Sequence, residues 1–174
     1  MKKVICLLMA LFLVFTLTAC FSDAPSKEAF NEGTENHTSS NKKEETFGLN
    51  ETAVFDTLKI TATEIKETTG STFFTPEEGK IFVGIKFIVE NISDEDQAIS
   101  SLLLFDAYAD DVKCDLSISA GASFSEGTID GEIAPGKKLI GWYPLEVTKD
   151  WKTLELNVVA DIFSSASAKF VFNK

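Results

Sequence analysis

Beyond residue 50 the sequence alternates between apolar and polar side chains, and this two-residue period is the strongest constraint on the fold. Val, Ile, Phe and Thr dominate the alternating segments, and these residue types favour the pleated surface of a β-sheet. The segments cover residues 54–66, 80–91, 101–109, 112–117, 138–147, 153–161 and 169–172. Turn residues separate them and no helical period is interleaved, so the sequence predicts an all-β antiparallel sandwich or barrel of about seven or eight strands.

Two of these segments can be placed within a sheet. Segment 80–91 carries apolar residues on both faces, because Phe82 and Ile88 stand out of phase with the main apolar series, and we expect it to be central. Pro144 has no backbone N–H to donate, so segment 138–147 is expected at a sheet edge or a bulge.

The first 20 residues are organised as a bacterial export signal. Two lysines precede an apolar run over residues 4–17, which is shorter than the roughly 20 residues that a membrane-spanning helix needs. The run ends in LTAC at residues 17–20, which resembles the lipobox of bacterial lipoproteins. This resemblance implies cleavage between Ala19 and Cys20, palmitate-type acylation of Cys20, and anchoring outside the cell membrane, which we expect to be that of a Gram-positive bacterium. A chance cysteine after an ordinary secretory signal is the alternative.

The chain therefore divides into a signal peptide (1–19), a lipidated cysteine with a flexible polar linker (20–50) and one folded domain (51–174). The linker is expected to be disordered because its polar, aperiodic composition cannot bury enough apolar surface to offset the entropy of ordering.

Composition removes several classes of function. The net charge is −11, or −13 once Lys2 and Lys3 leave with the signal, and there is no arginine, so we expect no nucleic-acid partner. The only histidine, His37, lies in the linker, and both methionines lie in the signal. The folded domain thus lacks the usual zinc and copper ligands and a Ser-His-Asp triad. We expect no cofactor and no enzymatic activity.

Cys114 is the one thiol left in the mature chain, because Cys6 belongs to the signal and Cys20 is expected to be acylated. No intrachain disulfide is then possible. Cys114 stands in phase with Val112 and Leu116, so a small buried side chain is the expected reading, and a reactive thiol is the alternative.

Two acidic turns offer the only candidate metal ligands. Asp94, Glu95 and Asp96 lie in one turn, and Asp110 and Asp111 lie in another. Calcium takes six to eight oxygen ligands from such loops, but Asp is also common in turns because it hydrogen-bonds its own backbone. We favour solvated turns over a weak calcium site. Paired carboxylates could also hydrolyse glycosides, although spacing along the sequence does not establish the required separation.

Five aromatic positions are candidates for the core or for a partner contact. Phe73 and Phe74 lie in a loop and either cap one end of the sandwich or form an exposed binding lip. Trp142 and Tyr143 should point to opposite faces of one strand, with one in the core and the other exposed. Trp142 and Trp151 are expected to fill the core.

Two motifs carry a family resemblance: GKIFVGIKFIVENISDED at residues 79–96 and IAPGKKLIGWYPLEV at residues 133–147. Together they resemble a secreted bacterial domain of unknown function, family 4352, over residues 54–172. The resemblance implies an immunoglobulin-like sandwich similar to a mycobacterial immunoprotective extracellular antigen. The motifs are structural, and they imply no established activity. At residues 110–111 this chain has Asp-Asp where Asp-Gly is common in the family.

The sequence thus predicts a monomeric, lipid-anchored, non-catalytic binding or accessory module at the cell envelope. Its partners would be the membrane, through the lipid on Cys20, and an envelope protein or glycan. A calcium-dependent binding module and a carboxylate-dependent envelope hydrolase are the alternatives.

Overall fold

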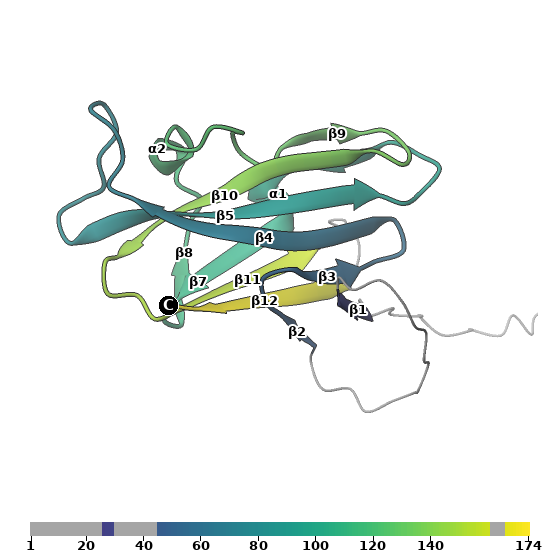
Figure 1. The fold of residues 1–174 in the computed structure, drawn as a ribbon, viewed down its shortest axis with the longest axis horizontal. Coiled ribbons are helices and arrows are strands. Elements are labelled where there is room, and N and C mark those ends of the chain that lie inside the picture. Colours follow the sequence, from purple (N-terminus) through teal and green to yellow (C-terminus); the bar gives the residue numbers. More distant parts are fainter. Residues whose placement is uncertain (1–25, 30–44, 161–165) are drawn as a thin grey trace, which may run out of the picture.

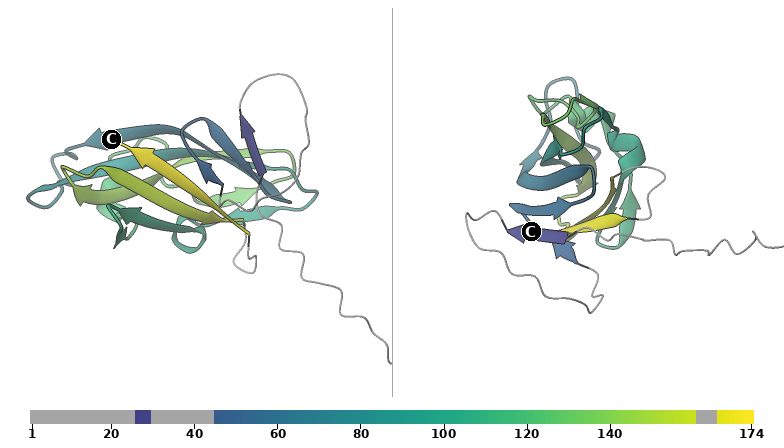
Figure 2. Two further views of the ribbon diagram at one scale, coloured as in Figure 1. Left: turned by 90° about the horizontal axis from the view of Figure 1, so that it is seen from below. Right: turned by 90° about the vertical axis from the view of Figure 1, so that its right-hand side faces the viewer.

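The computed structural model describes residues 26–29, 45–160 and 166–174. They form two five-stranded β-sheets that lie against each other (Figures 1 and 2). The first sheet contains, in order, β1 (Ser26–Ala29), β3 (Glu51–Val54), β4 (Leu58–Thr68), β5 (Lys80–Asn91) and β10 (Lys138–Thr148). The second sheet contains β2 (Thr46–Phe47), β12 (Ser167–Asn173), β11 (Thr153–Val159), β7 (Phe105–Ala109) and β8 (Val112–Cys114).

Four short elements complete the described fold. β6 (Gln97–Ile99) and β9 (Gly131–Ile133) pair in a small sheet of their own. Helices α1 (Ser101–Leu104) and α2 (Ile118–Gly121) are single turns. None of the helices in the described part of the chain is long and apolar enough to cross a membrane.

The predicted antiparallel β-sandwich is confirmed, and so is the position of two strands. β5 pairs with β4 on one side and β10 on the other, as its two apolar faces predicted. β10 is the last strand of the first sheet, which is where the missing N–H of Pro144 can be tolerated. The pairing of β2 with β12 is parallel, whereas the other named strand pairs are antiparallel.

The core lies between the sheets and is built by the alternation seen in the sequence. Its inward residues include Leu58, Ile60, Ala62, Val83, Ile85, Phe87, Val89, Phe105, Ala107, Leu154, Leu156, Val158, Phe170 and Phe172. Aromatic rings link the two layers, since the Phe87 ring lies 5.5 Å from that of Phe170 and 5.3 Å from that of Phe105. Edge-to-face contacts of this kind add to the free energy gained by burial.

The outer face of the first sheet carries a second apolar cluster. Residues 117–130 fold over this face, and α2 lies above β10 and β5 in Figure 1. Phe82, Phe124 and Trp142 are buried there with Ala120. The Phe124 and Trp142 rings stack at 4.8 Å.

This second cluster corrects the expectation that one of Trp142 and Tyr143 is exposed. Their side chains do belong to different clusters, but both are buried, because segment 117–130 covers the face that would otherwise meet solvent. Trp151 is buried in the main core, as expected, whereas Trp142 is buried outside it.

The folded part begins earlier than the predicted boundary at residue 51. Phe47 is 1% exposed and packs on Phe170 in the core. Strand β1, which lies inside the segment expected to be a linker, pairs with β3. A lone aromatic in a polar stretch gave no period from which to predict these contacts. Ala19, Cys20 and His37 lie outside the described residues.

The predicted strand over residues 101–109 is wrong in its first half. Residues 101–104 form α1, and only Phe105 onward is extended. In this turn Leu103 is 63% exposed and Leu104 is buried, whereas a strand over residues 101–109 would turn Leu103 toward the core together with Phe105. Asp130 explains the turn, because its carboxylate accepts hydrogen bonds from the backbone N–H and the hydroxyl of Ser101.

Candidate functional site

The β4–β5 loop (residues 69–79) carries the most exposed large apolar side chain among the described residues. Phe73 is 88% exposed and Phe74 is 44% exposed. The loop projects from one end of the sandwich (Figure 1). Of the two readings of Phe73 and Phe74, the cap on the sandwich is wrong, and the exposed lip describes the structure.

The tip of this loop is held by its own hydrogen bonds. The Ser71 N–H donates to the Phe74 carbonyl at 2.7 Å, and the Phe74 N–H donates to the Ser71 hydroxyl at 3.3 Å. Gly70 has φ +84°, and a Cβ there would lie 2.0 Å from the Phe74 carbonyl oxygen. Glycine is therefore required for this close approach. The tight turn keeps Phe73 directed away from the domain.

The second half of the β4–β5 loop is hydrogen-bonded to β10 and forms an ion pair with the first residue of β5. The Glu77 N–H donates to Glu146 at 2.7 Å, and the Lys80 ammonium pairs with the Glu77 carboxylate at 2.7 Å. The hydrogen bond from Lys80 lowers the pKa of Glu77. Glu77 and Glu78 are both exposed, so two carboxylates accompany the exposed phenylalanines.

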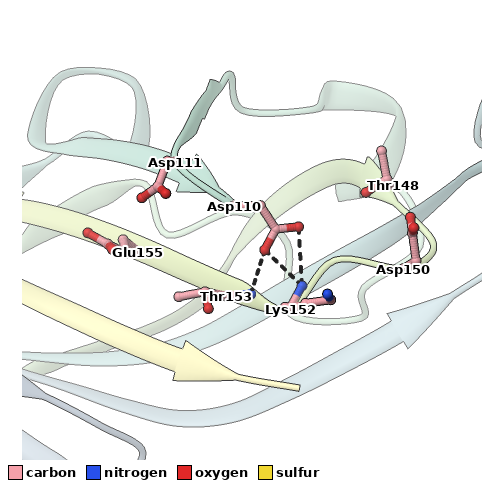
Figure 3. A pocket seen from close by; sticks show the side chains of 7 residues that line it. All are labelled: Asp110, Asp111, Thr148, Asp150, Lys152, Thr153 and Glu155. Carbon is pink, nitrogen blue, oxygen red and sulfur yellow. Dashed lines mark hydrogen bonds between the residues drawn. The ribbon is translucent and has the colours of Figure 1, made fainter.

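A polar depression of about 640 Å³ lies beside the β7–β8 turn (Figure 3). Its lining includes Asp110, Asp111, Asp150, Lys152, Thr153 and Glu155. The Asp110 carboxylate accepts hydrogen bonds from the backbone N–H groups of Lys152 and Thr153, both at 2.9 Å. Asp110 and Asp111 have φ 49° and 65°, so both take the left-handed conformation of a two-residue hairpin turn. Asp tolerates this conformation, which accounts for the absence of the usual glycine. Asp110 therefore links the β7–β8 turn to the connection between β10 and β11.

The other acidic turn is organised by Asn91, which is fully buried. Its amide group donates to the carbonyls of Glu95 and Ile133 at 2.7 and 2.8 Å, and its side-chain oxygen accepts from the Ser93 N–H and hydroxyl. The Asn91 backbone bonds Gly136 and Lys137. Asp94, Glu95 and Asp96 are exposed around this turn. The two motifs of residues 79–96 and 133–147 thus meet at one asparagine.

The structure does not bring the two acidic turns together. Asn91 pairs with Leu58 at one end of β4 and β5, whereas Asp110 contacts the connection that follows β10 at the other end. Residues 26–29, 45–160 and 166–174 contain no group of three His, Cys, Asp or Glu side chains placed to hold a metal ion. The geometry therefore gives no support to a calcium site built from both turns.

Cys114 is half-buried, and it lines a depression of about 430 Å³ between β8 and β10. Burial, followed by the nearby Asp115, raises the pKa of the thiol to about 11. The nucleophilic thiolate is thus scarce at neutral pH. Val112, expected to be buried in phase with Cys114, is 69% exposed.

Sequence reasoning missed several surface and cover residues. Leu102 and Ile118 are 75% and 84% exposed, although short apolar stretches usually indicate core. Glu126 accepts a hydrogen bond from the Trp142 indole at 2.6 Å and pairs with Lys86. The Lys86 contact, then the indole, lowers the pKa of Glu126 to about 2. These partners are far apart in sequence, so no local signal marks them.

Comparison with solved structures agrees with the fold. A candidate lipoprotein from Bacillus subtilis, YcdA, matches with a TM-score of 0.57 and 18% identity, over 68% of this chain and 37% of its own. The chain therefore spans little more than a third of that protein. An uncharacterised β-sandwich protein from Clostridium difficile matches with a TM-score of 0.51 and 15% identity, over 79% of this chain and all of its own.

A secreted protein of Mycobacterium tuberculosis, MPT63, has a TM-score of 0.49 and 11% identity over 77% of this chain, a likeness too slight to carry weight alone. No curated protein matches the chain. The family model for the domain of unknown function DUF4352 matches residues 47–169, starting at the buried Phe47. The chain belongs to the DUF4352 family.

Proposed function

We propose that this protein is a lipid-anchored, extracytoplasmic module that binds an envelope protein or glycan as a monomer and performs no catalysis. The LTAC stretch at residues 17–20 supports the anchor, and the similarity to a candidate lipoprotein supports the location. The anchor on Cys20 would hold the chain outside the membrane of a Gram-positive bacterium.

The observation that carries the binding role is the exposure of Phe73 on an ordered loop. Full burial of a phenylalanine side chain stabilises a protein or complex by about 1.5–3 kcal/mol. Large aromatic side chains in an interface are frequent energetic anchors. A turn that already fixes the residue lowers the entropy lost on binding. A partner that covers Phe73 on binding would explain why this apolar ring is exposed in the unbound chain.

Neither alternative function gains a comparable observation. In the described part of the chain, Asp110 is engaged with backbone N–H groups, and the acidic turn after Asn91 lies at the other end of the sandwich. Cys114 is held mainly as the thiol. A hydrolase would need a nucleophile or a carboxylate pair free to act on a substrate.

The test of binding uses envelope fragments of the producing bacterium and the labelled chain from residue 21. We expect saturable retention that Phe73→Ala weakens by about tenfold or more. Ile118→Ala is the matched control, since Ile118 is 84% exposed but lies outside the β4–β5 loop. Equal retention of the unchanged chain, Phe73→Ala and Ile118→Ala would contradict a binding role for Phe73.

The test of the anchor is mass spectrometry of the mature protein. We expect an acylated Cys20 at the N-terminus of the wild type and an uncleaved, unacylated precursor for Cys20→Ser. An unmodified mature N-terminus at Phe21 or beyond in the wild type would contradict the anchor.

A further inference from the structure

One end of the first sheet is defined by a row of paired residues. Ser26 pairs with Val54, Val54 with Lys59, Lys59 with Glu90, and Glu90 with Lys138. The described N-terminal strand β1 therefore starts at this end, which we call the Ser26 end. Figure 1 shows β1 and β3 together on that side of the molecule.

The β4–β5 loop lies at the opposite end. Its strands close with Thr68 paired to Phe82, and Phe82 paired to Glu146. Phe82 and Glu90 are eight residues apart on β5, which is about 26 Å at roughly 3.3 Å per residue. Phe73 lies beyond the Phe82 row, so the sandwich separates it from the Ser26 end.

The chain between Cys20 and Ser26 limits how far the Ser26 end can stand from the membrane. Six residues span at most about 20 Å even when fully extended. A lipid on Cys20 thus holds the Ser26 end near the bilayer, while the β4–β5 loop can point away from it. This step rests on the anchor of the proposed function.

The chemistry of the loop disfavours the bilayer as its target. Glu77 and Glu78 are exposed in the same loop as Phe73, and the Glu77 side chain is 73% exposed. Lys80 pairs with Glu77, so these three side chains leave a net negative charge beside the loop. A ring that entered an anionic membrane surface would bring these carboxylates against lipid headgroups of the same charge. A projecting loop with Phe73 as its most exposed ring instead fits a concave apolar pocket, and the carboxylates complement basic side chains around it.

We propose that the domain stands with its Ser26 end toward the membrane and presents Phe73 outward to a protein. That protein would bear an apolar pocket edged by lysine or arginine side chains. The pocket would receive the Phe73 ring, and the basic edge would meet Glu77 and Glu78.

The orientation is tested by energy transfer to an acceptor-labelled lipid. The full lipidated chain is placed in vesicles of phosphatidylglycerol and phosphatidylethanolamine, with Cys114→Ala combined with a donor on Thr72→Cys or Ile92→Cys. Thr72 lies in the β4–β5 loop, and Ile92 lies next to the Ser26 end. We expect transfer from position 92 to exceed that from position 72 at least twofold. Equal transfer, or greater transfer from position 72, would overturn the orientation.

The partner is tested in growing cells with p-benzoylphenylalanine at position 73 of the full chain, and at position 118 as the control. We expect a discrete protein adduct from position 73 that position 118 does not give. Glu77→Lys with Glu78→Lys should lower its yield at least fivefold, because a basic edge would then be repelled.

The outcomes separate this inference from the proposed function. Absence of any adduct from position 73 removes both. An adduct with lipid alone also contradicts both. A glycan adduct, or a protein adduct that ignores the charge reversal, overturns the partner proposed here and leaves the binding role of the proposed function standing.

Discussion

The side chain of Asn91 joins two segments that lie 42 residues apart in sequence. All of its polar atoms are used, in a site without access to water. A buried polar group without a partner costs about 1–3 kcal/mol, so removing one member of this arrangement strands several others. We therefore regard the NISDED sequence of residues 91–96 as a structural staple.

Asn91→Ala should lower the free energy of unfolding by about 3 kcal/mol, because the Ile133 carbonyl and the Ser93 groups lose their partner. Urea unfolding followed by tryptophan fluorescence measures this loss. Asp94→Ala is the control, since this exposed carboxylate should change the unfolding free energy by less than about 0.5 kcal/mol. Equal effects of the two changes would contradict the role of Asn91.

Cys114 should react slowly with thiol reagents in the folded protein. Its pKa of about 11, against 9.0 in the absence of burial, leaves roughly 50-fold less thiolate at pH 9 than in the unfolded chain. In a chain from residue 21, where Cys114 is the only thiol, labelling at pH 9 should be slower by about that factor. Because the pKa of Cys114 is raised, its protonated thiol contributes fully to the free energy of unfolding below pH 9. This contribution is lost as the pH rises toward 11. Equal labelling rates with and without urea would show that Cys114 is unprotected.

Among single residues, the core residues of the long alternating strands could be predicted from the sequence, whereas Phe47, Leu104 and those of the candidate site could be predicted only in part or not at all. The inward series of β5 followed from period two alone. The sequence identified Phe73 and Phe74 as unusual but left their direction open, because a loop has no period and the Gly70 turn decides where they point. The burial of Trp142 depends on Phe124 and Glu126, which no local pattern connects to it.

At the scale of elements, β5 and the cover segment 117–130 depend on each other. Gly84 lies on the outer face of β5, in phase with Phe82, and the Phe124 and Trp142 rings occupy the space above it. A Cβ on Gly84 would lie 2.5 Å from the Phe124 ring. The strand was predictable from its pattern, but the reason for its glycine was not, since the cover segment has no strand or helix period of its own.

Gly84→Ala should therefore destabilise the fold by about 1–3 kcal/mol through overpacking against Phe124. Combining it with Phe124→Leu should restore part of the loss, because the smaller side chain leaves room for the methyl group. A double-mutant cycle measured by urea unfolding tests this coupling. Strictly additive effects would mean that Phe124 does not exclude a side chain at position 84 and that the Trp142 ring alone does.

Helix α1 shows why the strand over residues 101–104 was predicted wrongly. Three successive leucines fit a buried strand or a buried helix equally well when judged by composition. The hydrogen bonds from Ser101 to Asp130, 29 residues away, fix the turn, and a contact at that separation leaves no mark in the local sequence.

For the whole molecule, the class of fold was predictable because two-residue alternation leaves few alternatives to a sandwich. Its N-terminal limit was not, because β1 and β2 are short and their pairings with β3 and β12 are long-range. The pairing of β1 with β3 determines at which end of the first sheet Ser26 lies.

The separation of the acidic turns leads to a prediction about calcium. Because Asn91 and Asp110 lie at opposite ends of the described fold, millimolar calcium should raise the melting temperature no more than magnesium at equal ionic strength, since both only screen the negative charge. Thermal unfolding with each ion measures this. A calcium-specific rise of several degrees that Asp111→Asn or Asp94→Asn abolishes would contradict it.

The central claim is that a turn built on Gly70 holds Phe73 ready for a partner, and binding isotherms to envelope fragments test it most directly. The chain from residue 21 is compared with Phe73→Ala, which removes the ring, and Gly70→Ala, which keeps the ring but disrupts its turn. We predict that each change weakens binding by about 2 kcal/mol, or about 30-fold, while both variants remain folded by thermal unfolding. Wild-type affinity in either folded variant would contradict the account.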